Sequence, residues 1–128
     1  MAEPVKGVGT PAASQVEEAV LDGEDQKIIT LARASRARTG AAEGAAVRDT
    51  DGRTYAACTV DLPSLKLTAL QAAVAAAVAS GAPGLEAAAV VTDSPDLDEA
   101  STAAVRDLSA RAPLFRADGA GRLLDTLR

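Results

Sequence analysis

The 128-residue sequence contains no histidine, no tryptophan and a single cysteine, Cys58. Without histidine, no Ser–His or Cys–His pair can form, so hydrolases that depend on such pairs are excluded. One cysteine also excludes a disulfide within the chain. With no histidine available to activate it, we interpret Cys58 as a buried, unreactive small apolar residue.

Aromatic residues are almost absent, since Tyr55 and Phe115 are the only two. Hydrophobic residues nevertheless make up 48% of the chain, so the core must consist of alanine, valine, leucine and isoleucine. Elements rich in alanine bury enough apolar area only when they approach one another closely. A chain of this length can form one domain with its own core.

Long hydrophobic runs are missing as well. The alanine-rich stretch 67–79 is too short and too weakly hydrophobic to span a bilayer, and no apolar signal segment follows Met1. We therefore expect a cytoplasmic protein that does not contact a membrane.

Basic residues are fewer than acidic ones, 13 against 18, which gives a net charge of −5 at pH 7. This sign is opposite to the one that attracts nucleic acid. The middle of the chain is the exception, with Arg33, Arg36, Arg38 and Arg48. We interpret these arginines mainly as a solvated face and do not expect nucleic acid as the ligand.

Hydrophobic periodicity divides the chain into an N-terminal arm and one domain. Residues 1–22 lack a hydrophobic period and predict a flexible arm, which leaves 23–128 as the domain. A first helix is predicted over 23–38, with either Asp22 or the Glu24–Asp25 pair at its N-terminus and Gly40 at its end.

An α/β pattern follows the first helix. Two short runs joined by the Asp51-Gly52 pair predict a β-hairpin. The remaining elements are predicted as a helix over 64–80, a strand over 86–92, a helix over 96–110, a strand over 113–117 and an amphipathic turn or short helix over 123–127. The order αββαβαβα favours a three-layer α/β/α sandwich with a mixed sheet of four or five strands.

Several stretches of the chain resemble the cytidine deaminases. Gly44–Val47 and Asp51–Asp61 match the Val-Gly-Ala-Ala-Leu, Asp-Gly-Lys and Gly-Cys-Asn-Val-Glu-Asn segments of that family. Ala77–Gly81 is similar to its Ala-Val-Ser-Glu-Gly, and Asp93–Pro95 to its Asp-Thr-Pro. The resemblance covers about residues 25–127 and implies the cytidine deaminase fold.

The zinc motifs of the resembled family are not present. Zinc deaminases place a His or Cys and, two residues later, a Glu at the start of the second helix, and Pro-Cys-x-x-Cys at the start of the third. Here Thr68 stands at the first metal ligand and Leu70 at the proton-shuttling Glu, and residues 100–104 contain no thiolate. A hydrolytic zinc site takes imidazole, thiolate or carboxylate ligands. We expect no metal, no cofactor and no zinc-dependent deamination, unless another chain supplies the site.

The resemblance also places the substrate pocket. Ala41 replaces the Phe that covers the base, Thr59 replaces the Asn that holds the ribose, and Asp61 keeps a carboxylate in place of the family's Glu. We expect a reduced pocket, partly filled by Leu67 and Leu70, with weak or no binding of nucleosides. The acids near the third helix, namely Asp93, Asp96, Asp98 and Glu99, are interpreted as helix caps rather than a cation site.

The function that best fits these observations is a non-catalytic, cytidine deaminase-like binding or interaction module, and a protein partner stays open. The first alternative is an enzyme of nucleoside metabolism that uses non-standard residues or a partner chain. The second is an RNA-associated accessory protein. Helix 64–80 is apolar on every side, and members of the resembled family pack through these helices. We therefore expect a homo-oligomer, either a dimer or a tetramer.

Overall fold

The computed structural model describes residues 21–128. Most of the predicted flexible arm, residues 1–20, lies outside the described residues. In chain order the elements are α2 (Gly23–Thr39), β1 (Gly44–Asp49), β2 (Thr54–Cys58), β3 (Val60–Leu62), β4 (Leu65–Leu67), α3 (Ala69–Ala79), β5 (Leu85–Val91), α4 (Glu99–Leu108), β6 (Leu114–Ala117) and β7 (Leu123–Leu127). None of the helices among these residues has the length and hydropathy needed to cross a membrane.

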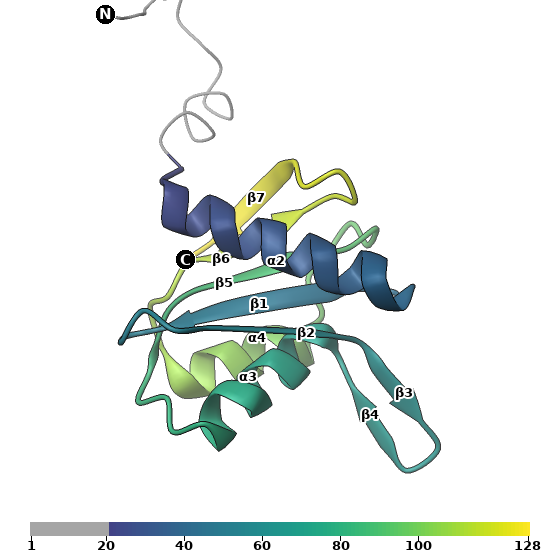
Figure 1. The fold of residues 1–128 in the computed structure, drawn as a ribbon, viewed down its shortest axis with the longest axis horizontal. Helices are drawn as coiled ribbons and strands as arrows, with labels where there is room; N and C mark the ends of the chain where they lie inside the picture. Colours follow the sequence, from purple (N-terminus) through teal and green to yellow (C-terminus); the bar gives the residue numbers. More distant parts are fainter. Residues whose placement is uncertain (1–20) are drawn as a thin grey trace, which may run out of the picture.

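The main sheet has five strands in the order β2-β1-β5-β6-β7. β1 is antiparallel to both β2 and β5, whereas β5 and β6 are parallel, and β7 returns antiparallel to β6. Helix α2 covers one face of the sheet, and α3 and α4 cover the other (Figure 1). The predicted three-layer sandwich with a mixed sheet is confirmed, and the β1–β2 hairpin forms one edge.

The strand side chains alternate between two cores on opposite faces of the sheet. On β1, Ala45 and Val47 pack in the core with α3 and α4, whereas Ala46 packs in the core with α2. β5 divides its residues in the same way. Because most of these side chains are alanine or valine, the helices lie close to the sheet backbone, as the scarcity of aromatic residues predicts.

Local signals set the ends of α2 and the turn of the first hairpin. The Asp22 carboxylate caps α2 by accepting a hydrogen bond from a backbone N–H of the first turn, and Gly40 ends the helix with a φ of 68°. In the β1–β2 turn, Gly52 adopts a φ of 87°. The buried Asp49 carboxylate accepts a hydrogen bond from the N–H of Arg53 at 2.9 Å and holds the turn closed.

The predicted helix over residues 64–80 begins too early. Its first turn belongs instead to a two-stranded hairpin, β3–β4, which projects from the body of the domain, and α3 begins at Ala69 (Figure 1). Leu65–Leu67 alternates apolar, polar and apolar residues, which is the period of a strand. Thr68 and Gln71 then form a capping box that fixes the start of the helix.

The predicted turn or short helix over residues 123–127 is also wrong, because this segment is the edge strand β7. Gly121 adopts a φ of 85°, and the Asp118 carboxylate accepts two backbone N–H groups of the turn at 2.9 Å each. These interactions close a β-turn rather than start a helix. Arg116 of β6 and Asp125 of β7 then pair across the strands at 2.9 Å.

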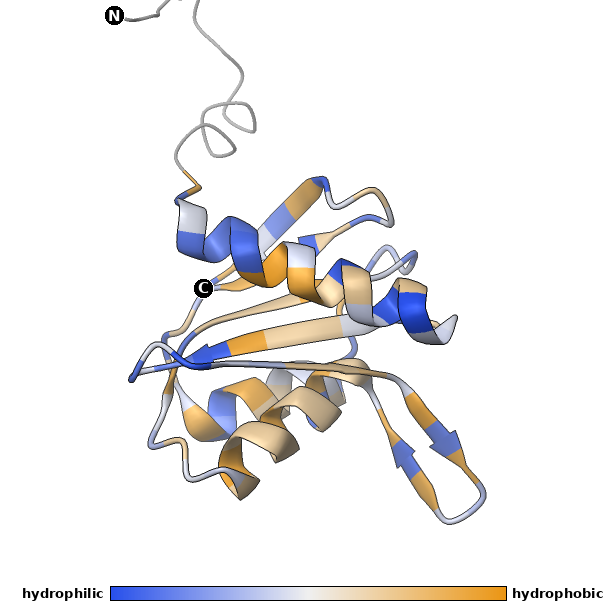
Figure 2. Cartoon of the chain, in the orientation of Figure 1, coloured by the Kyte–Doolittle hydropathy of each residue, from blue (hydrophilic) through white to orange (hydrophobic). Residues whose placement is uncertain are grey.

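Apart from Gln71, helix α3 consists of apolar residues, but the domain buries only part of it. Leu70, Ala73 and Ala77 are fully buried against the sheet and α4, whereas Val78 is 54% exposed. The solvent-exposed residues of the helix are Ala75, Ala76, Val78 and Ala79. Apart from Gln71 in its first turn, the helix has apolar colours in Figure 2, so its outer side offers apolar surface that the described residues do not cover.

Helix α2 crosses the start of β1 at very short range. A Cβ atom at Gly44 would overlap the carbonyl oxygen of Ala32 and lie 2.9 Å from the Cβ of Arg36. The residue at this crossing must therefore be glycine. The crossing also fixes the last turn of α2, and with it Arg36, beside the loops that leave the strands.

Replacing Gly44 by alanine should push α2 off the sheet and destabilise the domain by roughly 3 kcal/mol. Denaturant unfolding followed by circular dichroism measures this change. Gly23→Ala is the matched control, since a Cβ at Gly23 has no atom within 4 Å. We expect the control to change stability by less than about 1 kcal/mol. Equal stability of the two variants would contradict the close crossing.

Candidate functional site

A cavity of about 530 Å³ opens where β1 begins and β5 ends. Its walls come from the last turn of α2, the β3–β4 hairpin, the start of α3 and the loop that follows β5. The volume lies within the range of small-molecule sites. Leu67 lines the cavity, as predicted, whereas Leu70 does not.

Leu70 does not fill the cavity as the sequence predicts. It is fully buried in the core between the sheet and helices α3 and α4. Thr68 caps the helix, so Leu70 falls in the first turn, on the side that packs against the sheet. A carbon side chain in this place adds core volume and contributes no polar group to the cavity.

Two hydroxyl groups meet where helices α3 and α4 begin. Thr68 Oγ1 accepts a hydrogen bond from the Gln71 N–H at 3.1 Å. The Ser101 hydroxyl, which is 2% exposed, donates to the same oxygen at 2.8 Å. Both lone pairs of Thr68 Oγ1 are thus used, and this buried polar pair is satisfied.

The three residues assigned to a nucleoside pocket lie in different surroundings. The Ala41 carbonyl accepts a hydrogen bond from Arg36 Nε, and Ala41 does not line the large cavity. Thr59 and Asp61 do line it. The Thr59 hydroxyl is already engaged by a backbone N–H at 3.0 Å, and Asp61 pairs with Lys66 at 2.7 Å on the exposed hairpin.

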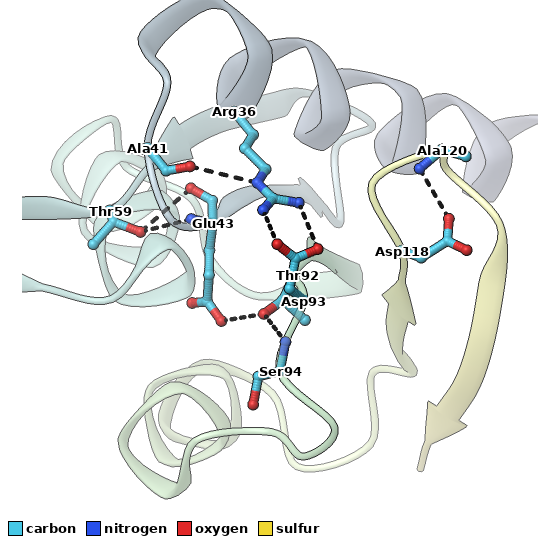
Figure 3. A network of polar contacts seen from close by, with 9 residues as sticks. All are labelled: Arg36, Ala41, Glu43, Thr59, Thr92, Asp93, Ser94, Asp118 and Ala120. Carbon is cyan, nitrogen blue, oxygen red and sulfur yellow. Dashed lines mark hydrogen bonds and ion pairs between the residues drawn. The ribbon is translucent and has the colours of Figure 1, made fainter.

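Sequence reasoning missed the polar network at the centre of the cavity wall (Figure 3). Arg36 Nη2 lies 2.6 Å from Asp93 Oδ2, and the second amino group of Arg36 reaches the other carboxylate oxygen at 3.4 Å. Glu43 Oε2 accepts a hydrogen bond from the Thr92 hydroxyl at 2.7 Å. Thr92 in turn accepts one from the Ser94 N–H at 3.0 Å. The signal for Glu43 was its place directly before the Gly-Ala-Ala segment, where the resembled family has an apolar residue.

The acids near α4 play different parts. Asp98 caps α4 by accepting hydrogen bonds from the N–H groups of Ala100 and Ser101, as predicted. Asp93, also interpreted as a cap, pairs with Arg36 instead. The hydrogen bonds and the charge of Arg36 hold the pKa of Asp93 below its ordinary value.

The predicted basic region does not form one free patch. Arg36 is paired with Asp93, and Arg48 contacts Asp25 and Glu86 at 3.0 Å each. Two of the four arginines therefore have carboxylate partners, which weakens the RNA-binding alternative. The single cysteine lies on β2 and is half-buried rather than fully buried.

Comparison with known proteins places this fold. The model of the cytidine deaminase-like family matches residues 21–121. The chain belongs to this family. A cytidine deaminase from Burkholderia pseudomallei, solved at 1.6 Å, shares the fold with a TM-score of 0.69 at 22% identity, over 79% of this chain and 89% of that one. A cytidine deaminase from Mycobacterium leprae has a TM-score of 0.63 at 21% identity, over 74% and 89% of the two chains. No curated protein matches the sequence.

The residues of this chain do not fit the zinc ion of the family's motifs. Thr68 stands at the first ligand, and the Pro-Cys-x-x-Cys motif falls on residues 100–104, which puts Ser101 and Ala104 at the two thiolates. Neutral hydroxyls and a methyl group are not zinc ligands. In the part of the chain that the structure describes, no three His, Cys, Asp or Glu side chains are grouped to hold a metal ion.

The lowered pKa of Asp93 predicts how pH acts on the Arg36 pair. The pair contributes stability above the ordinary carboxyl pKa of about 4 and loses it as the pH falls through the lowered pKa of Asp93. Arg36→Gln should return the pKa of Asp93 to its ordinary value, as measured by carboxyl NMR titration. Arg38→Gln, an exposed position on the same helix, should leave it unchanged. A pKa of Asp93 that is insensitive to Arg36→Gln would contradict the pairing.

Proposed function

We propose that this chain is a non-catalytic member of the cytidine deaminase-like family, a binding or interaction module that holds no zinc. The observation that carries the proposal is the hydrogen bond between Thr68 and Ser101, 2.8 Å long, at two positions that match metal ligands. A satisfied pair of hydroxyls has neither the charge nor the polarisability that holds Zn²⁺ in proteins.

The proton-transfer role has no candidate at its family position either. A general acid or base must lie within hydrogen-bond reach of the reacting group. Leu70 carries no proton to move and is 0% exposed. Without a metal to lower its pKa, water stays protonated at neutral pH and supplies no hydroxide nucleophile. We therefore expect no deamination by the zinc mechanism.

Metal content and turnover test this proposal together. Purified protein should contain no stoichiometric zinc by elemental analysis and should form no uridine from cytidine. The triple variant Thr68→Cys, Ser101→Cys and Ala104→Cys is the positive control, and we expect it to bind about one zinc per chain, because it restores thiolates at all three positions. One zinc per wild-type chain, with uridine formed at an enzyme-like rate, would contradict the proposal.

A binding role, rather than a purely structural one, is favoured by the cavity. It has a volume of about 530 Å³ and polar side chains along its wall, although the motifs for zinc are absent. We expect weak or no binding of nucleosides. The Thr59 hydroxyl already accepts a hydrogen bond from a backbone N–H, and the Asp61 carboxylate is paired with Lys66. We also expect the protein to act in the cytoplasm.

We infer in addition that the protein is a homo-oligomer packed through α3. The outer side of this helix is apolar, with Val78 54% exposed. Leu62 and Leu65, near the tip of the β3–β4 hairpin, are 54% and 49% exposed. Small residues such as Ala76 let a second helix approach closely, so an identical surface on another copy is a suitable partner.

A charge in the middle of this surface should separate the copies. Ala76→Glu is expected to lower the mass in solution by a factor of two or more, because assembly of the variant would require the burial of an unpaired carboxylate. Analytical ultracentrifugation at micromolar concentration measures the change. Ala34→Glu, at an exposed position of α2 on the opposite face of the sheet, should keep the wild-type mass. A wild type that sediments as a monomer would rule out the interface.

A further inference from the structure

Glu43 is held in place more firmly than a surface carboxylate needs to be. Its backbone N–H donates to the Thr59 hydroxyl at 3.0 Å, and its backbone carbonyl accepts the Thr59 N–H at 3.1 Å. Its Oε2 accepts from Thr92, a residue that is only 2% exposed and is itself held by the Ser94 N–H. Figure 3 shows the side chain extended from the start of β1 toward Thr92. The carboxylate is therefore positioned before any ligand arrives.

The charges around the cavity leave Glu43 without a cation. Two cations line the wall, and each is paired with an acid of the same wall: Arg36 with Asp93 at 2.6 Å, and Lys66 with Asp61 at 2.7 Å. Among the described residues, Glu43 makes no ion pair, and its Oε1 accepts no hydrogen bond. A carboxylate oxygen with no donor from the protein can accept a charge-assisted hydrogen bond from a cationic ligand in the cavity.

The rest of the wall suits a small organic ligand rather than a hydrated metal ion. Val60 and Leu67 supply apolar surface beside the polar groups. Thr68 lines the cavity, and since its oxygen already accepts two hydrogen bonds, its own proton is left to donate. The wall thus combines one uncompensated carboxylate with an apolar strip and a hydroxyl donor.

We propose that the cavity binds a small organic cation with N–H donors, of the amidinium or primary ammonium class, and that Glu43 is the residue that anchors it. The inference rests on the proposed binding role of this cavity. Thr92 acts as a positioning residue, because its hydroxyl donates to Glu43 Oε2 at 2.7 Å and so orients the carboxylate. An apolar valine at the position of Glu43, as in the resembled family, could not bind such a cation.

Comparing the binding of benzamidine with that of its neutral analogue benzamide tests whether the ligand must carry a positive charge. Both are planar and similar in size, so they differ mainly in the cation that Glu43 would contact. In amide NMR titrations of the full chain we expect benzamidine to shift Glu43, Thr92 and Ser94 saturably. We expect benzamide to bind about tenfold more weakly, which corresponds to the loss of one charge-assisted hydrogen bond.

Two variants identify the anchor. Glu43→Gln should remove the tenfold preference for benzamidine, whereas Glu99→Gln, an exposed acid outside the cavity, should keep it. Thr92→Val keeps the charge of Glu43 but removes the hydrogen bond that orients its side chain. It should therefore lower the affinity for benzamidine and leave the affinity for benzamide unchanged. If Glu43→Gln does not fold, Thr92→Val still tests whether Glu43 anchors the cation.

Three results would overturn the inference: equal binding of the two probes, no saturable shift at millimolar benzamidine, or a Glu43→Gln variant with the wild-type preference. None of these results depends on zinc or on cytidine turnover. The failure of this inference is therefore distinguishable from the failure of the proposed function.

Discussion

The short crossing of α2 over β1 sets the geometry of the whole domain. Its sheet carries mostly alanine and valine, so the helices can be held only at close range, and Gly44 permits this where it faces the carbonyl of Ala32. The same crossing places Arg36 above the start of β1, within reach of Asp93 after β5. The loop residues of the cavity are thereby supported by a rigid helix, which keeps the Arg36 and Asp93 side chains within hydrogen-bond distance.

On the opposite face, hydrophobic packing and one hydroxyl pair join α3 to α4. Leu70, Ala73 and Val105 share a core with the sheet, so the position of the two helices does not depend on a metal. Thr68 and Ser101 then bond to each other where the family's motifs place metal ligands. A buried hydroxyl left alone would be costly, and this pairing removes that cost. The fold can therefore keep its helix ends together with no ligand at all.

The sequence predicted those parts of the fold that depend on local signals. Asp22 and Gly40 delimit α2, and Gly52 marks the first hairpin, because each acts on its own neighbours. The β3–β4 hairpin and β7 were missed, since a three-residue alternation is too short to separate a strand from the start of a helix, and an edge strand is stabilised by pairing with its neighbour in the sheet. The Arg36–Asp93 pair was missed for the same reason: its partners are 57 residues apart and meet only through the sheet. Family motifs located Thr68 and Leu70 but not Glu43, which departs from them.

The β3–β4 hairpin connects the cavity to the outer surface of the domain. The hairpin contributes Lys66 and Leu67 to the cavity wall, and near its tip Leu62 and Leu65 are about half exposed. A short two-stranded hairpin has little stability of its own, so its position depends on whatever packs against it. A second copy that covers the tip would hold the hairpin, and with it the Asp61–Lys66 pair that neutralises this wall. If the chain self-associates and binds a ligand as proposed, the two events would be coupled through this hairpin, because ordering it in advance lowers the entropy that a ligand must overcome.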